Sequence, residues 1–424
     1  MFKTKLRSSA SLLIALALVS GNQVFAQSHN WNTQARQQAE NSNSRALSIL
    51  TKGETVKGYV DQAIAALLRA TSADPTDPVP FATLGLALDL KQRYSEALDA
   101  LNKSYQLEPK SKETMLSIAI THYLGRTYAK SESVLNTLLK QFPTQCDAHI
   151  DLGFTYIRLG DFDKARRNFK QAISCNPNCQ PAYQGEALCD YLEGNLEDAF
   201  AEVQHAETLR PYLPATLLLA EIAAIRGDET AMNSALKRVA KVKQPLEQRP
   251  MTMIGFSPQH DFHWDPFILD DFDTDDFIKA RALDLPRQDS KRASLAGSGK
   301  ISKALTHVEA ALSSAPPNDF YLLRQAGLIN LAAGNYGDAV KIFNDVTQAC
   351  PNSHIDFLYL GRALWLAGNK ADAAKCIKVY AEHFPSQQLA GVFTSIKNNA
   401  PAAPEAPPTQ PSQPTQQPAV DTGF

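Results

Sequence analysis

Proline recurs along the chain at a constant spacing of 34 residues, and this period constrains the fold more than any other feature. The prolines are Pro75, Pro109, Pro143, Pro177, Pro211 and Pro245. A period of this length indicates tandem copies of one supersecondary unit. With units that begin at Ser44 and every 34 residues thereafter, two columns are mostly small. The eighth position holds Thr51, Gly85, Ala119, Gly153, Ala187 and Glu221. The twentieth holds Ala63, Ala97, Ser131, Ala165, Ala199 and Asn233.

The best-formed unit contains residues 151–177 and has the pattern of two amphipathic helices. The first ends near Gly160, and the second runs from about Phe162 to Cys175. Small residues at the eighth and twentieth positions let the two backbones approach, and proline ends the second helix. Because one pair cannot bury its apolar faces alone, we expect neighbouring pairs to stack into an all-α superhelix, a solenoid.

The residues of this unit resemble the tetratricopeptide repeat. They match its pattern of apolar, small and proline positions at Leu152, Gly153, Tyr156, Ala165, Phe169, Ala172 and Pro177. The neighbouring unit matches at Leu84, Gly85, Ala97, Leu101 and Pro109. The resemblance implies a non-enzymatic module that holds a protein or peptide partner.

After Pro245 the period lapses and then returns. We expect six repeats over residues 44–247, a non-repeat aromatic and acidic insertion over 248–284, and three repeats over 285–387. The first repeat of the second group is poor, with Arg292 at its eighth position. A linker over 27–43 precedes the repeats. The Pro/Gln-rich tail over 388–424 is expected to be mostly disordered, because such a composition cannot bury a core.

The first residues have the pattern of a secretory signal peptide. Basic residues within 1–7 precede an apolar run over 10–19 and a small-residue cleavage pattern, so we expect cleavage after Ala26. The run is shorter than the roughly 18 residues of a membrane span; an uncleaved anchor is the alternative. We therefore expect an exported chain, periplasmic or secreted, in a bacterial envelope, with no membrane span after cleavage.

Charge and cysteine content argue against two classes of protein. The formal net charge of -2 gives no whole-chain reason to bind nucleic acid. Six cysteines are too few for a disulfide scaffold, although an exported chain can pair some of them. A disulfide among Cys175, Cys179 and Cys189 and a pair between Cys350 and Cys376 remain open, with buried free thiols as the alternative.

The insertion contains the residues that most favour chemistry. His260, Asp261, His263 and Asp265 are candidate metal ligands, and five aspartates over 270–276 offer oxygen ligands to calcium. Their spacing matches neither the HExxH zinc motif nor the calcium-binding loop. The interleaved aromatics favour a loop packed on the solenoid, so we predict no catalytic residue, metal or cofactor. The alternative function is an envelope enzyme or metal-binding protein that uses residues 256–277.

The resemblance to tetratricopeptide proteins also implies a concave groove lined by the first helix of each repeat. The residues at the lining positions are mostly apolar or aromatic, which suits a helical or extended apolar peptide. We predict a partner-binding groove formed by Leu116, Ile120, Tyr123, Ile150, Phe154, Ile157, Leu188, Tyr191, Leu218, Ile222 and Ile225. Two occupants remain open: an external protein segment, or the protein's own insertion or other half.

Overall fold

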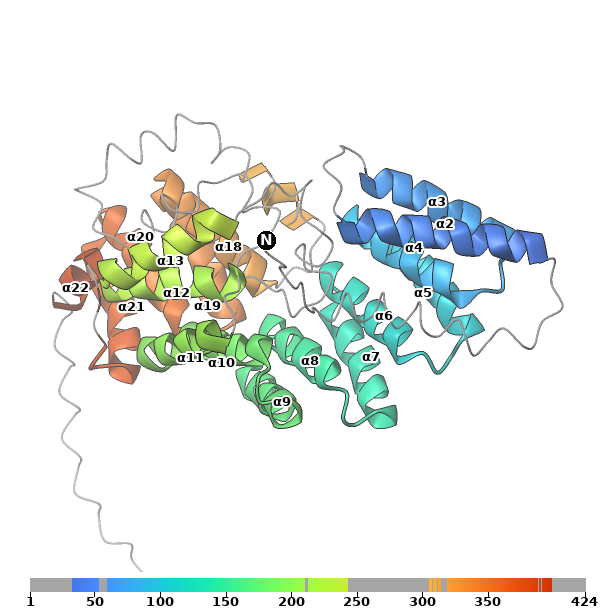
Figure 1. Cartoon of the computed structure of the whole chain (residues 1–424). Coiled ribbons are helices and arrows are strands. Elements are labelled where there is room, and N and C mark those ends of the chain that lie inside the picture. The colour runs from blue at the N-terminus through green and yellow to red at the C-terminus, as the bar shows by residue number, and fades with distance from the viewer. Residues whose placement is uncertain are drawn as a thin grey trace, which may run out of the picture.

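The computed structural model is an all-α solenoid of helix pairs (Figure 1). It describes residues 33–52, 59–209, 213–242, 319–387, 389 and 391–398, together with short helical stretches at 305–306, 308–310 and 312–313. The first block of repeats contains α2 (Thr33–Lys52), α3 (Tyr59–Ala73), α4 (Pro78–Leu90), α5 (Tyr94–Leu107), α6 (Lys112–Leu124), α7 (Tyr128–Gln141), α8 (Cys146–Arg158), α9 (Phe162–Cys175), α10 (Gln180–Glu193), α11 (Leu196–Leu209), α12 (Leu213–Arg226) and α13 (Glu229–Val242). The second block contains α18 (Phe320–Ala333), α19 (Tyr336–Ala349), α20 (His354–Leu366), α21 (Lys370–His383) and α22 (Gly391–Asn398).

Local sequence signals set the ends of these helices. Asp77 and Ser111 accept hydrogen bonds from backbone N–H groups in the first turns of α4 and α6. Pro109, Pro143 and Pro177 lie in the turns that follow α5, α7 and α9, as the period predicts. The turn between α8 and α9 contains Gly160 with a φ of +75°, a conformation that costs glycine little.

One aromatic ring explains the small residue at the eighth position. Phe169 of α9 lies between Gly153 of its own repeat and Gly185 of the next. A Cβ atom on Gly153 would come within 2.5 Å of the ring, and one on Gly185 within 2.3 Å. The two glycines therefore form the space that the ring fills, within a repeat and between repeats.

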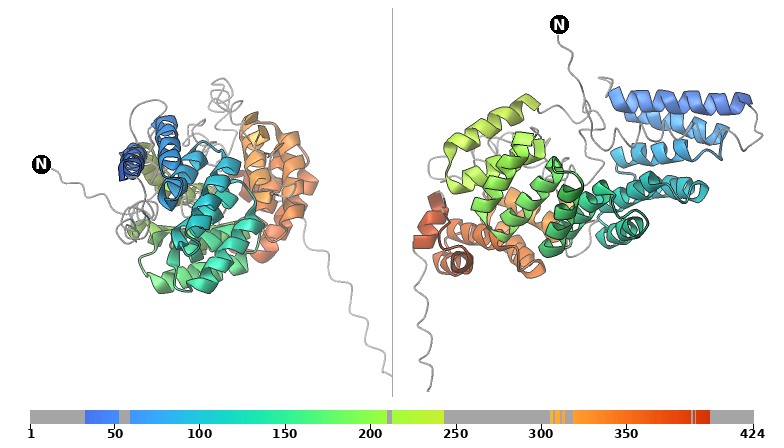
Figure 2. Two further views of the ribbon diagram at one scale, coloured as in Figure 1. Left: turned by 90° about the vertical axis from the view of Figure 1, so that its right-hand side faces the viewer. Right: turned by 60° about the horizontal axis from the view of Figure 1, so that its bottom comes forward.

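The chain curves so that its two blocks touch. Figure 1 shows α18–α21 beside α10–α13, with α2–α5 at the far end of the first block. The second view in Figure 2 also places the second block against the green helices of the first, and α10 packs directly against α20. Repeats more than 150 residues apart in sequence therefore share one interior; for example, Ser353 bonds to Leu192, 161 positions away.

Two expected boundaries differ from the structure. Helix α2 begins at Thr33, within the expected linker, because its apolar positions continue upstream of Ser44 as far as the buried Ala39. Helix α22 lies within the expected tail, where Phe393 and Ile396, three residues apart, are buried on one face. The insertion over 248–284 and most of the first repeat of the second block lie outside the described residues.

Candidate functional site

The inner face is the side of α6, α8, α10 and α12 that carries the predicted groove residues. Each of these residues is at most 5% exposed. They are Leu116, Ile120, Tyr123, Ile150, Phe154, Ile157, Leu188, Tyr191, Leu218, Ile222 and Ile225. Their role in binding a partner stays a prediction, and in this structure they do not form an open surface.

Phe154 and Tyr123 have packing partners within the first block. The ring of Phe154 meets that of Phe169 edge-on, with centroids 5.1 Å apart. The Tyr123 ring lies 5.4 Å from that of Tyr128. Phe154 therefore contributes to the seam of its own helix pair, a role that its position in the repeat pattern does not indicate.

Arg158, at the end of α8, connects the inner face to the second block. Its Nε donates to the Tyr123 hydroxyl at 2.8 Å. Its guanidinium carbon lies 3.8 Å from the centroid of the Tyr321 ring on α18, a distance at which a cation is attracted to the ring face. Nearby, the rings of Phe162 and Phe320 lie 6.5 Å apart, edge to face. Helix α18 therefore covers this part of the inner face.

A buried polar cluster joins α10 and α12 to α18 and α20. Arg324 is fully buried; its Nε donates to Asp356 Oδ1 at 2.8 Å and its Nη2 to the Tyr191 hydroxyl at 2.7 Å. The Tyr191 hydroxyl donates to Glu221 Oε1 at 2.6 Å, and the Tyr359 hydroxyl donates to the same oxygen at 3.1 Å. The cluster thus buries one carboxylate of the first block, Glu221, together with the ion pair of Arg324 and Asp356 of the second block.

The electrostatics of Arg324 follow from this cluster. Burial alone lowers the pKa of a guanidinium, but the nearby Tyr191 oxygen and the Asp356 carboxylate outweigh it and raise the pKa of Arg324. The charge is therefore retained in the interior because its partners compensate for lost hydration.

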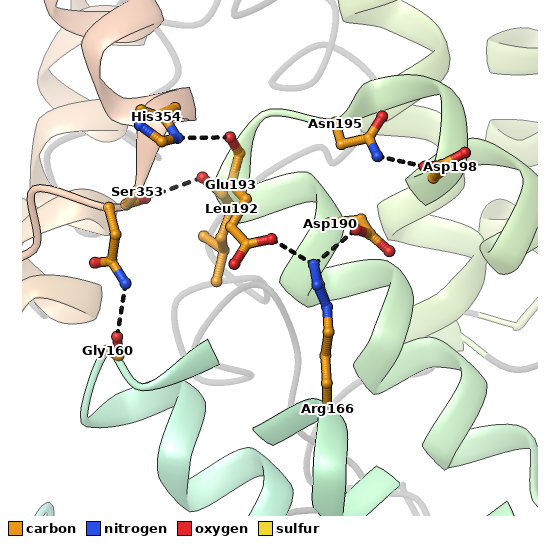
Figure 3. A network of polar contacts seen from close by, with 10 residues as sticks. Gly160, Arg166, Asp190, Leu192, Glu193, Asn195, Asp198, Ser353 and His354 are labelled. Atoms are coloured by element: carbon orange, nitrogen blue, oxygen red, sulfur yellow. Dashed lines mark hydrogen bonds and ion pairs between the residues drawn. The ribbon is translucent and has the colours of Figure 1, made fainter. Parts of the chain in front are cut away.

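The second block also binds the turns of the first block through backbone oxygens (Figure 3). Asn352 Nδ2 donates to the carbonyl of Gly160 at 3.0 Å, and the Ser353 hydroxyl to that of Leu192 at 3.3 Å. The His354 ring nitrogen Nδ1 lies 3.1 Å from the Glu193 carbonyl. We call these the turn contacts, and they include the Tyr380 hydroxyl, which donates to the Gly194 carbonyl at 3.0 Å.

The second block also contacts the third repeat, here through side chains on both sides. Asp319 accepts from the Tyr128 hydroxyl at 3.0 Å and lies 3.5 Å from Arg126 Nη1. It also caps α18 by accepting from the Leu322 N–H. Three consecutive turns of the first block, after α6, α8 and α10, are therefore held by the second block.

Arg166 forms ion pairs with two carboxylates of the next repeat. Its Nη2 lies 2.6 Å from Asp190 Oδ1 and 2.5 Å from Glu193 Oε2, both on α10 (Figure 3). It therefore joins the fourth repeat to the fifth, next to the turn that the second block binds.

The other candidate residues are the metal ligands of the insertion and the cysteines. His260, Asp261, His263 and Asp265 lie outside the described residues. Within the described part of the chain, no group of histidine, cysteine and carboxylate side chains has the arrangement of a metal site. All six cysteines are free thiols, and Cys189 is fully buried. None of the described helices is long and apolar enough to cross a membrane.

Arg324, Asp356 and Asn352 are absent from the predicted groove. All three lie in the second block, whose position relative to the first is not encoded in the period. One signal was available for Arg324: it is the only charged residue in the helix sequence FYLLRQAGLINLAA. A single charge in such an apolar helix is either exposed or paired in the interior, and the structure shows the second arrangement.

Models of the tetratricopeptide repeat match residues 146–179 and 294–354 of this chain. BBSome complex member BBS4 of Mus musculus is 24% identical over 165 residues, which are 38% of this chain and 31% of the relative. Anaphase-promoting complex subunit 3 of Schizosaccharomyces pombe is 26% identical over 105 residues, 25% of this chain and 16% of the relative. The chain thus spans less than a third of the length of these relatives.

Solved structures with a similar arrangement include a tetratricopeptide repeat protein from Parabacteroides merdae. It is 16% identical, covers 77% of this chain and 99% of its own, and has a TM-score of 0.39. A structure of pilF from Pseudomonas aeruginosa is 15% identical, covers 51% of this chain and 97% of its own, and has a TM-score of 0.40. The family models thus identify tetratricopeptide repeats at residues 146–179 and 294–354.

Proposed function

We propose that this chain is a non-enzymatic protein-interaction scaffold of the cell envelope, which binds a segment of a partner protein on the inner face. Tetratricopeptide repeats are modules for holding proteins, which supports the class of function. The observation that carries the proposal is that the inner face already holds helices, those of the chain's own second block. Arg158 and Tyr191 contact α18 directly through Tyr321 and Arg324.

In this proposal the second block and the partner compete for the same face. The turn contacts are hydrogen bonds to carbonyl oxygens, and such bonds add only about 1 kcal/mol each because water replaces them when they break. A partner helix that supplies apolar side chains and its own donors, including donors to Tyr191 and Glu221 in place of Arg324 and Tyr359, can therefore take the place of the second block. The partner-free chain is closed, and the partner-bound chain is open.

A reversible lock tests this competition. A Cβ atom on Gly160 would lie 3.2 Å from Cys350 Sγ, so Gly160→Cys places a second thiol where a disulfide can join the two blocks. Cys146 and Cys175 are replaced by serine to avoid other pairings. Gly368→Cys is the matched control, because Gly368 also has a positive φ but no side chain within 4 Å of the added Cβ.

We expect affinity capture from the native host to recover a partner polypeptide with the reduced lock variant and with the control. The oxidised lock variant should lose at least 90% of this recovery, and dithiothreitol should restore it. Equal recovery with the oxidised and reduced forms would show that the partner does not use the inner face. Failure of the lock disulfide to form would show instead that the blocks are not docked in solution.

The proposed location is tested separately. Expression of the full chain in a bacterial host, followed by cell fractionation and N-terminal sequencing, should yield an envelope protein that begins at Gln27. A full-length chain that begins at Met1 and remains in the cytoplasm would contradict export. It would leave the proposed binding of a partner unaffected.

A further inference from the structure

Two cysteines lie at the open end of one helix pair. Cys146 is the first residue of α8 and Cys175 is the last residue of α9. The two helices are joined by the turn at Gly160 and pack against each other, so they run antiparallel. Their outer ends therefore lie together, at the end opposite the turn.

A second helix pair shows that side chains at these two positions can touch. His354 is the first residue of α20 and His383 is the last residue of α21, the same two positions one block later. Their ring centroids lie 4.0 Å apart. The register of the repeat thus directs the first and last side chains of a pair toward each other.

The two thiols differ in access to solvent. Cys175 is exposed and Cys146 is partly buried. Burial, and next the adjacent Cys175 thiol, raises the pKa of Cys146 to about 11. The third nearby cysteine, Cys179, is only 5% exposed and precedes α10, so it is less accessible than Cys175.

We propose that Cys146 and Cys175 are a site of reversible disulfide formation that staples the open end of the α8–α9 pair. A disulfide donor, such as oxidised glutathione or an oxidised dithiol protein, supplies the oxidising equivalents. The Cys175 thiolate attacks one donor sulfur and releases one thiolate. The Cys146 thiolate then attacks Cys175 Sγ, which forms the new S–S bond and releases the second thiolate.

The thiol–disulfide exchange conserves electrons and protons. The donor disulfide gains two electrons and the two cysteines lose them, and the two protons from the thiols pass to the released donor thiolates. The second step requires deprotonation of Cys146, so closure should become faster as pH rises. The staple closes a loop that contains both helices of the best-formed repeat, and this reduces the entropy of the unfolded chain.

The test uses the full mature chain with oxidised glutathione, followed by peptide mapping without reduction. We expect a cross-link between the peptides of Cys146 and Cys175, and a melting temperature about 5 °C higher after oxidation. Dithiothreitol should reverse both changes. Cys179→Ser should oxidise like the wild type, whereas Cys146→Ser should retain glutathione on Cys175 and show no rise in melting temperature.

Other results would overturn the proposal. These are a Cys175–Cys179 cross-link, a wild-type chain that stops at the glutathione adduct, or an unchanged melting temperature after closure. Peptide mapping of the wild type needs no substitution, so a variant that folds poorly does not affect the conclusion. Circular dichroism of each serine variant verifies its helix content before oxidation.

Discussion

At the residue scale, two buried ionisable groups, Arg324 and Asp89, differ in the hydrogen-bond partners that compensate for burial. Arg324 has a carboxylate and a hydroxyl within hydrogen-bond distance. Asp89, buried near the end of α4, accepts one hydrogen bond from the Thr121 hydroxyl at 2.7 Å. Its other oxygen has no hydrogen-bond partner among the described residues. Burial therefore raises the pKa of Asp89 well above its ordinary value, and the bond from Thr121 offsets only part of this effect.

The raised pKa of Asp89 predicts a specific pH dependence. The folded chain holds this proton more tightly than the unfolded chain, so the contribution of Asp89 to stability is fully present below the unfolded pKa of about 4 and falls as pH rises. Each unit of raised pKa costs about 1.4 kcal/mol at a pH above both values. Asp89→Asn keeps an oxygen for Thr121 and removes the ionisation.

We expect the Asp89→Asn chain to equal the wild type in stability near pH 4 and to exceed it increasingly toward pH 7. Urea denaturation at several pH values measures the difference. Asp338→Asn is the control, because Asp338 forms an exposed ion pair with Lys341 on α19. A constant difference between the Asp89→Asn chain and the wild type at all pH values would mean that the pKa of Asp89 is the same in the folded and the unfolded chain.

At the element scale, helices pack through a ring that occupies a space left by missing side chains. The contact between Phe169 and the two glycines joins α8, α9 and α10. In the second block, Phe343 lies in the same way against Gly327, where a Cβ atom would come within 2.9 Å. The spacing of neighbouring helices is therefore set by glycine, and it is sensitive to one methyl group.

Alanine substitution tests this spacing. Gly153→Ala and Gly185→Ala each force the Phe169 ring to move, and we expect a loss of about 1–3 kcal/mol in the free energy of unfolding. Gly337→Ala on α19 is the matched control, because its added Cβ meets no atom within 4 Å. That substitution should be neutral or should stabilise by up to about 1 kcal/mol. Thermal and urea denaturation distinguish these outcomes, and equal effects at all three positions would contradict the packing argument.

The helix pairs could be predicted from sequence because every signal that defines them is local. Gly153, Phe169 and Pro177 act within their own helix pair or at its border with the next pair, so the period indicates their roles. The docking of Arg324 on Tyr191 depends instead on the curvature of the whole first block and on the path of the connection between blocks. The sequence pattern places the groove residues on one face of the helices, but it does not determine that the second block covers this face.

At the scale of the whole molecule, the two blocks share an interface that makes their stabilities depend on each other. Arg324→Met removes the donor that reaches the Tyr191 hydroxyl of the first block. It also leaves Asp356 of the second block buried without its cation, and removal of one partner of a buried pair typically costs about 3–5 kcal/mol. We expect this substitution to weaken the docking of the second block while each helix pair remains folded. Lys341→Met removes an exposed ion pair and should change stability by less than about 1 kcal/mol.

Hydrogen exchange measured by mass spectrometry can follow each block separately. In the wild type we expect the turns after α8 and α10 and the start of α20 to be protected together. In the Arg324→Met chain these segments should exchange at least tenfold faster, while the centre of α9 should not change. Unchanged protection at the turns would show that the cluster around Arg324 does not hold the blocks together.

The turn contacts have a consequence for how this interface responds to mutation. The second block supplies side chains, whereas the first block supplies the carbonyl oxygens of Gly160, Leu192, Glu193 and Gly194. Every amino acid has a carbonyl, so an alanine scan of Leu192 and Glu193 would leave both acceptors in place. Substitution of these two side chains therefore leaves the acceptor oxygens of the interface in place, and it acts instead on the core around Leu192 and on the ion pair between Glu193 and Arg166. Substitution of Asn352, Ser353 or Tyr380 in the second block removes the donor itself. We therefore expect these three positions to vary less among related sequences than Leu192 and Glu193.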